Sequence, residues 1–202
     1  MTLQEWGQLE EALALHKQLE ALFLEMGDKD GLQRSYCDRA LILKFCGRLE
    51  EAMALLKKQE ALCLELGNRN DLQISYGNQA LILQDLGRLE EAMALLKKKE
   101  AMCLELTNKD DLQRTYGNQA RILGYWGRLD EAMALHKKQE ALCLELGSRR
   151  GLGYCYSNWG LLARAQGDHT TERAKLQTAL DIFTELKMPL ERDAVAAELA
   201  KA

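Results

Sequence analysis

Hydrophobic residues recur along this chain at helical spacing. In the segment 87–107 the intervals are three, four or seven residues, through Leu89, Ala92, Met93, Leu96, Met102 and Cys103. Such spacing puts them on one stripe of an amphipathic helix. A second stripe, made by Tyr76, Ala80 and Leu83, predicts another helix from residue 71 or 72 to residue 86. Asn70 or Asp71 is the expected N-cap of this helix. The pattern therefore predicts helices in pairs.

These helix pairs repeat every forty residues. The blocks 47–86 and 87–126 are nearly identical, and related copies fill 7–46 and 127–166, each opening on a glycine. A single helical hairpin cannot bury its apolar face alone, so neighbouring hairpins must stack. We therefore predict an all-α fold, an α-solenoid of stacked antiparallel helical hairpins.

Small residues mark the turns and the closest helix contacts of each block. Gly27 and Gly67 end the second helices, where the chain needs a left-handed residue. Thr107 stands in that column once, which predicts a less relaxed turn. Small side chains also fill two columns inside the helices, and these predict close helix packing: Ala40, Ala80, Ala120 and Gly160 in the first helix, and Ala12, Ala52, Ala92 and Ala132 in the second.

The period predicts one array over residues 1–202. Its parts are a partial first unit 1–30, the repeats 31–67, 71–107, 111–147 and 151–187, and a capping helix 189–202. Pro189 suits the first turn of that helix. Glu172 takes a column otherwise held by alanine, which predicts an end repeat with one side facing solvent. Residues 2–6 align with the tail of a first helix, which indicates either trimming from a longer array or an exposed end that binds a partner.

Charge and cysteine usage limit the classes of function. A net charge of -4 and a pI near 5.5 argue against nucleic acid and anionic membranes as partners. We find no membrane-spanning stretch and no secretory signal, and we expect a cytoplasmic, intracellular protein. Cys63, Cys103 and Cys143 lie one period apart in a column that also accepts Phe23, so they are interpreted as packing residues. No cysteine has the spacing of a metal site.

No catalytic constellation follows from the sequence. His16 and His136 take a column held elsewhere by Leu56 and Leu96, which indicates packing or partly exposed residues, and His169 lies in a turn. None has a partner acid or base at a recognisable position. The glycines are spread over the repeat turns, so no phosphate-binding loop is present. We therefore expect neither an enzyme nor a bound cofactor.

Within each block, the order of an aromatic residue, a small residue, leucine, glycine and alanine is characteristic. It is seen at Tyr76, Ala80, Leu83, Gly87 and Ala92, and a Leu-Gly-Asn closes the block at 66–68. The array resembles tetratricopeptide repeats, of the forty-residue type found in kinesin light chains and in the spindle-orientation adaptors with Leu-Gly-Asn repeats. The resemblance implies a right-handed superhelix whose first helices form a concave groove for an extended peptide. One departure is the family's alanine late in the second helix, replaced here by Leu19, Gln59, Lys99 and Gln139.

An asparagine column lies on the first helices, at Asn78, Asn118 and Asn158. In the resembling families the matching residues contact peptide backbone, and an amide side chain offers both a donor and an acceptor for this. The residues before them are all small, namely Cys37, Gly77, Gly117 and Ser157, which would let a peptide approach. The alternative is that asparagine and glycine only bridge adjacent helices.

The rest of the first-helix face varies between repeats. Its charged columns hold five basic residues, Arg34, Lys44, Arg114, Arg121 and Arg164, and two acidic ones, Asp38 and Asp85. Tyr125 and Tyr154 add aromatic surface. This combination predicts an acidic, partly apolar peptide, because arginine binds carboxylates with two parallel hydrogen bonds. The alternative is a face of charges that are merely solvated.

The favoured function is a protein-interaction scaffold that binds a protein or peptide segment in the groove. Two alternatives stay open. The near-identical repeats could form a structural array that self-associates end to end, or the array could be the regulatory or sensor segment of a larger signalling protein.

Overall fold

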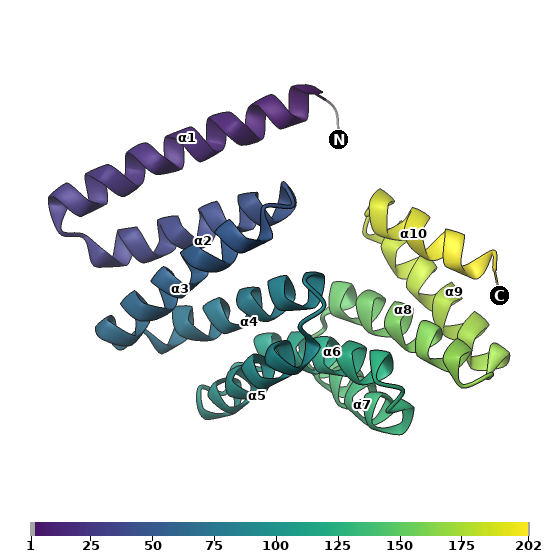
Figure 1. The fold of residues 1–202 in the computed structure, drawn as a ribbon. Helices are drawn as coiled ribbons and strands as arrows, with labels where there is room; N and C mark the ends of the chain where they lie inside the picture. Colours follow the sequence, from purple (N-terminus) through teal and green to yellow (C-terminus); the bar gives the residue numbers. More distant parts are fainter. Residues whose placement is uncertain (1–2, 202) are drawn as a thin grey trace. The chain divides into compact units, whose positions relative to one another are not determined.

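The computed structural model describes the backbone of residues 3–201 and the side chains of residues 9–201 (Figure 1). Residues 1–2 and 202, which fall in the predicted first unit and capping helix, lie outside the described residues. The described range holds ten α-helices and no strand, so the predicted all-α class is confirmed. The helices are α1 (Leu3–Met26), α2 (Lys29–Phe45), α3 (Leu49–Leu66), α4 (Arg69–Asp85), α5 (Leu89–Glu105), α6 (Lys109–Tyr125), α7 (Leu129–Glu145), α8 (Arg149–Ala165), α9 (His169–Glu185) and α10 (Pro189–Leu199).

The chain divides into two compact units, Met1–Met102 and Cys103–Ala202, here called the N-terminal and the C-terminal unit. In each unit, antiparallel helices joined by short turns pack side by side (Figure 1). Helices α2, α4, α6 and α8 are the first helices of successive repeats, and α3, α5, α7 and α9 are the second helices. That the repeats form one array, and that its superhelix is right-handed, stay predictions.

Each first helix begins at a polar N-cap residue. The side chain of this residue accepts a hydrogen bond from the backbone amide three residues later. The Asn68 side chain accepts a hydrogen bond from the Asp71 backbone N–H at 3.1 Å, and the Asp28 carboxylate accepts one from Gly31 N–H at 2.9 Å. The predicted N-cap at Asn70 or Asp71 is therefore wrong. The helix starts earlier because the residue next to the terminating Gly67 already caps the following helix.

The second helices end in a left-handed residue. Gly67 has φ 66°, which glycine adopts without steric cost. Thr107 takes the same position with φ 52°, as the predicted less relaxed turn requires. A β-branched residue in this region costs about 1–3 kcal/mol, which the surrounding helix packing must offset.

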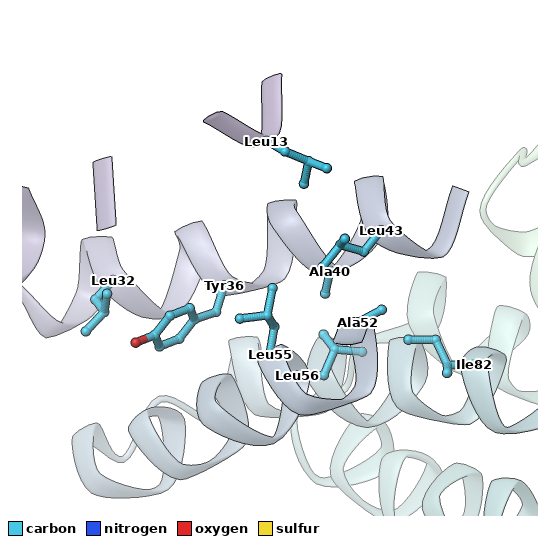
Figure 2. Close-up of a cluster of buried hydrophobic side chains, with 9 residues drawn as sticks. All are labelled: Leu13, Leu32, Tyr36, Ala40, Leu43, Ala52, Leu55, Leu56 and Ile82. Carbon is cyan, nitrogen blue, oxygen red and sulfur yellow. The ribbon is translucent and has the colours of Figure 1, made fainter. Parts of the chain in front are cut away.

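The core of the N-terminal unit lies between α1, α2, α3 and α4 (Figure 2). Figure 2 shows Leu13 of α1 facing α2, where Tyr36 and Ala40 point toward α3. Ala40 and Ala52 are completely buried. The predicted small-residue columns are thus confirmed as packing positions, and larger side chains there would overpack the core at a cost of about 1–3 kcal/mol.

In the C-terminal unit, apolar side chains of α9 pack against α10. Leu176, Ala179 and Phe183 form one cluster with Val195 of α10, and Cys143 packs with Leu152 and Ile182 in a second cluster. The cysteine column Cys63, Cys103 and Cys143 is completely buried and forms no disulfide, so its interpretation as a packing column is confirmed.

Glu172, which predicted an end repeat with one side facing solvent, does not itself face solvent. Its side chain is completely buried and forms an ion pair with Arg164 of α8. His169 Nδ1 lies 2.9 Å from the second carboxylate oxygen of Glu172, and the hydrogen bonds from His169 and then Arg164 lower the pKa of Glu172. Arg164 also donates to Glu198 Oε2 at 2.7 Å and to the Glu198 carbonyl at 2.8 Å. This network ties α8 and α9 to α10.

Candidate functional site

The asparagine column lies on three successive first helices, with each side chain half-buried. Asn78 on α4 donates from Nδ2 to Cys37 Sγ on α2 at 3.4 Å. At this position the amide bridges adjacent repeats, as the alternative interpretation proposed. Asn158 on α8 instead lines a pocket described below.

The small residues before the asparagines have a structural role. A Cβ added to Gly77 would lie 2.9 Å from Lys99 Nζ, and one added to Gly117 would lie 2.8 Å from Gln139 Nε2. Lys99 and Gln139 are buried there on the second helix of the same repeat. Helix packing therefore accounts for the two glycines, and a role of this column in peptide approach stays a prediction. The departure from the family's alanine has the same cause, because glycine on one helix makes room for a long polar side chain on the other.

Two of the five predicted basic residues lie in exposed pairs within one helix. Arg34 is 2.7 Å from Asp30, and Arg114 pairs with Asp110, each at the i,i+4 spacing. Exposed pairs of this kind contribute only about 0.3–0.5 kcal/mol. These two ion pairs bring the local charge close to zero, but each holds its guanidinium group only weakly.

Two others form contacts between helices. Lys44 Nζ of α2 lies 2.9 Å from Asp85 Oδ2 of α4, so this ion pair bridges two first helices of the N-terminal unit. Arg164 belongs to the Glu172 and Glu198 network. Neighbouring carboxylates therefore offset the charges of Arg34, Lys44, Arg114 and Arg164.

The remaining basic residue, Arg121, lies at a pocket in the C-terminal unit. The pocket has a volume of about 240 Å³ and lies between α6 and α8. It is lined by Ala120, Arg121, Gly124, Tyr125, His136, Asn158, Leu161, Leu162 and Ala165. The structure thus brings together three predicted residues, Arg121, Tyr125 and Asn158. The other six were not predicted as site residues.

Two columns that form an ion pair in the N-terminal unit hold small residues at the pocket. Gly124 and Ala165 take the columns of Lys44 and Asp85, whose ion pair joins α2 to α4. A Cβ on Gly124 would lie 3.6 Å from Leu162 Cδ1, an ordinary contact, so packing does not require glycine there. Glycine within a helix costs roughly 0.5–1 kcal/mol relative to alanine. Gly124 therefore leaves space at a cost in stability.

His136 on α7 also lines the pocket between α6 and α8. It is buried, as one of the two sequence interpretations had it, with Nδ1 3.2 Å from Gln139 Oε1 and its ring stacked on Trp159 at 6.4 Å between centroids. Burial lowers the pKa of His136, so the ring is neutral at pH 7. Because Gln139 Oε1 can only accept, we assign the proton to Nδ1, which leaves Nε2 as an acceptor.

The rim of the pocket is apolar and accessible. Tyr125 is 69% exposed and Leu161 is 38% exposed. Tyr154, also predicted for the site, lies elsewhere on α8. Its hydroxyl donates to Glu191 Oε1 at 2.7 Å, and its ring contacts Phe183 edge-on. Tyr154 thus helps to hold α10, and Arg34, Lys44, Arg114 and Arg164 also lie outside the pocket.

The part of the chain that the structure describes has neither a metal-binding cluster nor a membrane-spanning helix. Within it, no group of three or more histidine, cysteine or acidic side chains is arranged to hold a metal ion. No helix in that range is both long and apolar enough to cross a membrane.

Comparison with known families identifies the repeats. The tetratricopeptide repeat model matches residues 33–64 and 74–98, which lie within the first two predicted full repeats. These two segments match tetratricopeptide repeats, which confirms the predicted resemblance over this part of the chain. No curated protein matches the sequence significantly.

Solved structures show the same fold. BtubC (BKLC) from P. vanneervenii has a TM-score of 0.79 and 19% identity, with 92% of this chain and 77% of that chain covered. The kinesin light chain-like repeat protein of Podosopora anserina has a TM-score of 0.69 and 20% identity, with 92% of both chains covered. PlcR of Bacillus thuringiensis, solved with the peptide PapR7 and DNA, has a TM-score of 0.74 and 15% identity, with 95% of this chain and 74% of that chain covered. At these identities the likeness concerns the fold.

Proposed function

We propose that this protein is an interaction scaffold whose C-terminal unit binds an extended peptide segment, with one apolar side chain of the peptide in the pocket between α6 and α8. The observation that carries the proposal is the pocket itself. It joins Arg121, Tyr125 and Asn158 to an apolar lining, and Gly124 leaves it open without a packing reason. An apolar cavity of about 150 Å³ holds a benzene ring. A volume of about 240 Å³ therefore has room for one leucine, phenylalanine or tyrosine side chain.

Each part of the site has a role in this binding mode. Leu161 and Leu162 supply apolar contact, and burying one such peptide side chain contributes about 1.5–3 kcal/mol. The Asn158 amide can donate to a peptide carbonyl and accept from a peptide N–H. Tyr125 extends the apolar surface beyond the pocket, because its ring is largely exposed.

We propose further that an acidic residue lies beside the apolar one. Its carboxylate would meet Arg121, whose planar guanidinium suits bidentate hydrogen bonding. Arg34 and Arg114 lie outside the pocket, in exposed pairs with Asp30 and Asp110.

The fold supports this role. PlcR, which shares it, was solved with the peptide PapR7. Tetratricopeptide repeats act as binding surfaces, so the proposed role needs neither catalysis nor a cofactor. We also propose a cytoplasmic location, which the six free thiols fit because reducing compartments keep cysteines unpaired.

A selection from a random peptide library tests the function. The library is displayed on phage and panned against the full chain, and enriched peptides are synthesised with a fluorophore for anisotropy titration. We expect an enriched motif with one large apolar residue next to an acidic one. Replacing Tyr125→Ala weakens binding of these peptides several-fold.

Phe45→Ala is the matched control. Phe45 takes the Tyr125 column in the N-terminal unit and is also 69% exposed, but it lies outside the α6–α8 pocket. Its replacement leaves the affinities unchanged. Equal loss in both variants would contradict the assignment to the C-terminal unit, and enrichment of peptides without an apolar residue would contradict the pocket.

A further inference from the structure

Helix α1 leaves open a face that the other second helices bury. Leu15 is 55% exposed, whereas Leu55 in the same column of α3 is 7% exposed. Leu19 is 41% exposed, whereas Gln59 is 2% exposed. Leu22 extends the stripe at helical spacing and is also exposed. We call Leu15, Leu19 and Leu22 the α1 stripe.

The internal repeats show what covers this face. In each of them it is the first helix of the same repeat. Lys99 of α5 packs against Gly77 of α4, and Gln139 of α7 packs against Gly117 of α6. Both Lys99 and Gln139 share the Leu19 column. The α1 stripe therefore has the position and register of a surface for a first helix.

Helix α10 is a first helix with the opposite face open. Its Val195 is buried against α9. The residues in the same column of the other first helices are buried as well. On its other side, Ala196, Ala197 and Ala200 are exposed. Ala196 takes the column of the buried Tyr36, Tyr76 and Tyr116, Ala197 that of Gly77 and Gly117, and Ala200 that of the buried Ala40, Ala80 and Ala120.

We propose that α10 of one copy of this chain packs against the α1 stripe of a second copy, so that the two helices form one hairpin of the repeat type. Their sizes are complementary. Leu19 is an apolar side chain in a column otherwise held by long polar residues, and it would lie over Ala197, in the column where glycine receives those residues.

Charge supports the same pairing. In the internal repeats, a basic residue at the start of the first helix pairs with a glutamate at the end of the second, as in Lys29 with Glu65 and Arg149 with Glu185. Glu25 of α1 stands in that glutamate column. Pro189 takes the basic column in α10, and Arg192 follows one turn later on the same side, partly exposed and paired with the exposed Asp193 at 2.7 Å. Arg192 of one copy is thus placed to meet Glu25 of the next.

The contact is heterologous, because α10 and α1 are different surfaces. Copies therefore add one after another instead of stopping at a symmetric dimer. One helix pair is a small interface, so the association is weak and depends on protein concentration.

Two blocked variants of the full chain test the proposal by sedimentation velocity over a concentration range. Leu15→Glu/Leu19→Glu blocks the α1 stripe, and Ala196→Glu/Ala197→Glu blocks α10. All four positions are exposed, so helicity by circular dichroism should stay at the wild-type value. We expect the wild-type mass to rise above one chain with concentration and each variant alone to remain one chain. An equimolar mixture of the two variants should form a 1:1 dimer, because each supplies the surface that the other lacks.

Leu24→Glu is the control for α1. Leu24 is exposed, and so are Leu64, Leu104 and Leu144 in its column, so no first helix covers it in any repeat. This variant assembles like the wild type. A wild type that stays one chain at every concentration would overturn the proposal. So would assembly that survives the α10 replacements, since the α1 stripes would then be pairing with each other. Neither result bears on the pocket, which Tyr125→Ala tests separately.

Discussion

The face formed by α2 and α4 and the face formed by α6 and α8 use the same columns of the repeat for different purposes. In the first, Lys44 and Asp85 meet across the two helices and fill the space between them. In the second, Gly124 and Ala165 stand in those columns, and a pocket of about 240 Å³ remains. The comparison shows that a pocket lies where small side chains replace the residues of a structural contact.

The residue beneath the two faces also differs. Leu56 is completely buried under the first, and His136 takes its column under the second. The exchange brings a neutral imidazole to the lining of the pocket without exposing the core. The two faces therefore differ in shape and in polarity, although their repeats have nearly the same length and helix positions.

The largest effect on stability is expected for Leu56, beneath the face formed by α2 and α4. Leu56→Ala removes a completely buried side chain and should lower the free energy of unfolding by about 2–5 kcal/mol, measured by urea denaturation. His136→Leu restores the same column in the C-terminal unit with a side chain of similar size, and should change stability by less than about 1.5 kcal/mol. A small cost for Leu56→Ala would mean that this column is not core.

Closing the pocket should be the next largest effect. The variant Gly124→Lys/Ala165→Asp copies the ion pair of the N-terminal unit into the C-terminal unit. Peptides selected on the wild type should lose about 10- to 100-fold in affinity, which corresponds to the burial of one apolar side chain. Anisotropy titration measures the change.

The mirror variant, Lys44→Gly/Asp85→Ala, is its control. It empties the matching columns of α2 and α4 and should leave the affinity of those peptides at the wild-type value. If the mirror variant lost affinity as well, the peptide would contact both faces, and the contrast between them would have to be abandoned.

The histidine makes the second face sensitive to pH. Burial lowers the pKa of His136 below its ordinary value of 6.5. The unfolded chain therefore takes up a proton near pH 6.5 that the folded chain accepts only at lower pH. Stability falls as the pH drops from about 6.5 toward the folded-state pKa, with a slope of at most about 1.4 kcal/mol per pH unit. Urea midpoints of wild type and His136→Leu should diverge over this range, and parallel curves would show that burial does not control the ring.

The smallest effect is expected for the ion pair between Lys44 of α2 and Asp85 of α4. Both partners are partly exposed, so Lys44→Ala should lower the free energy of unfolding by only about 0.2–1 kcal/mol, and less in high salt. Thermal unfolding in low and high salt measures this. A larger, salt-independent loss would show that the Lys44 side chain stabilises through packing.

The sequence was sufficient for features that depend on local pattern. Helix pairs, the buried Cys63 column and the start of α10 at Pro189 follow from period, spacing and turn chemistry. The N-cap position was missed because Gly67 and Asn68 were both assigned to the end of one helix, whereas Asn68 begins the next.

The site was only partly predictable. Asn158 is predictable because its column recurs on the first-helix face, and Arg121 and Tyr125 because their columns vary. The charges of that face predict the ligand but not the pocket. The pocket is indicated by side-chain volume, which falls from Lys44 and Asp85 to Gly124 and Ala165. Its meaning depends on knowing that residues 41 apart meet across two helices, and spacing within one helix does not show this. For the same reason the sequence did not predict the ion pair of Glu172, since its partner Arg164 lies on another helix.

The cysteine column gives each unit its own chemical reporter. Cys63 and Cys143 occupy the same column, one in each unit, and burial is the main reason why the pKa of each thiol is raised to about 11. The folded chain therefore presents almost no thiolate at either position near neutral pH, and alkylation must wait for local opening. Mass spectrometry of the two alkylated peptides would record how often each unit opens under native conditions, so the chain already carries the labels needed to compare its halves.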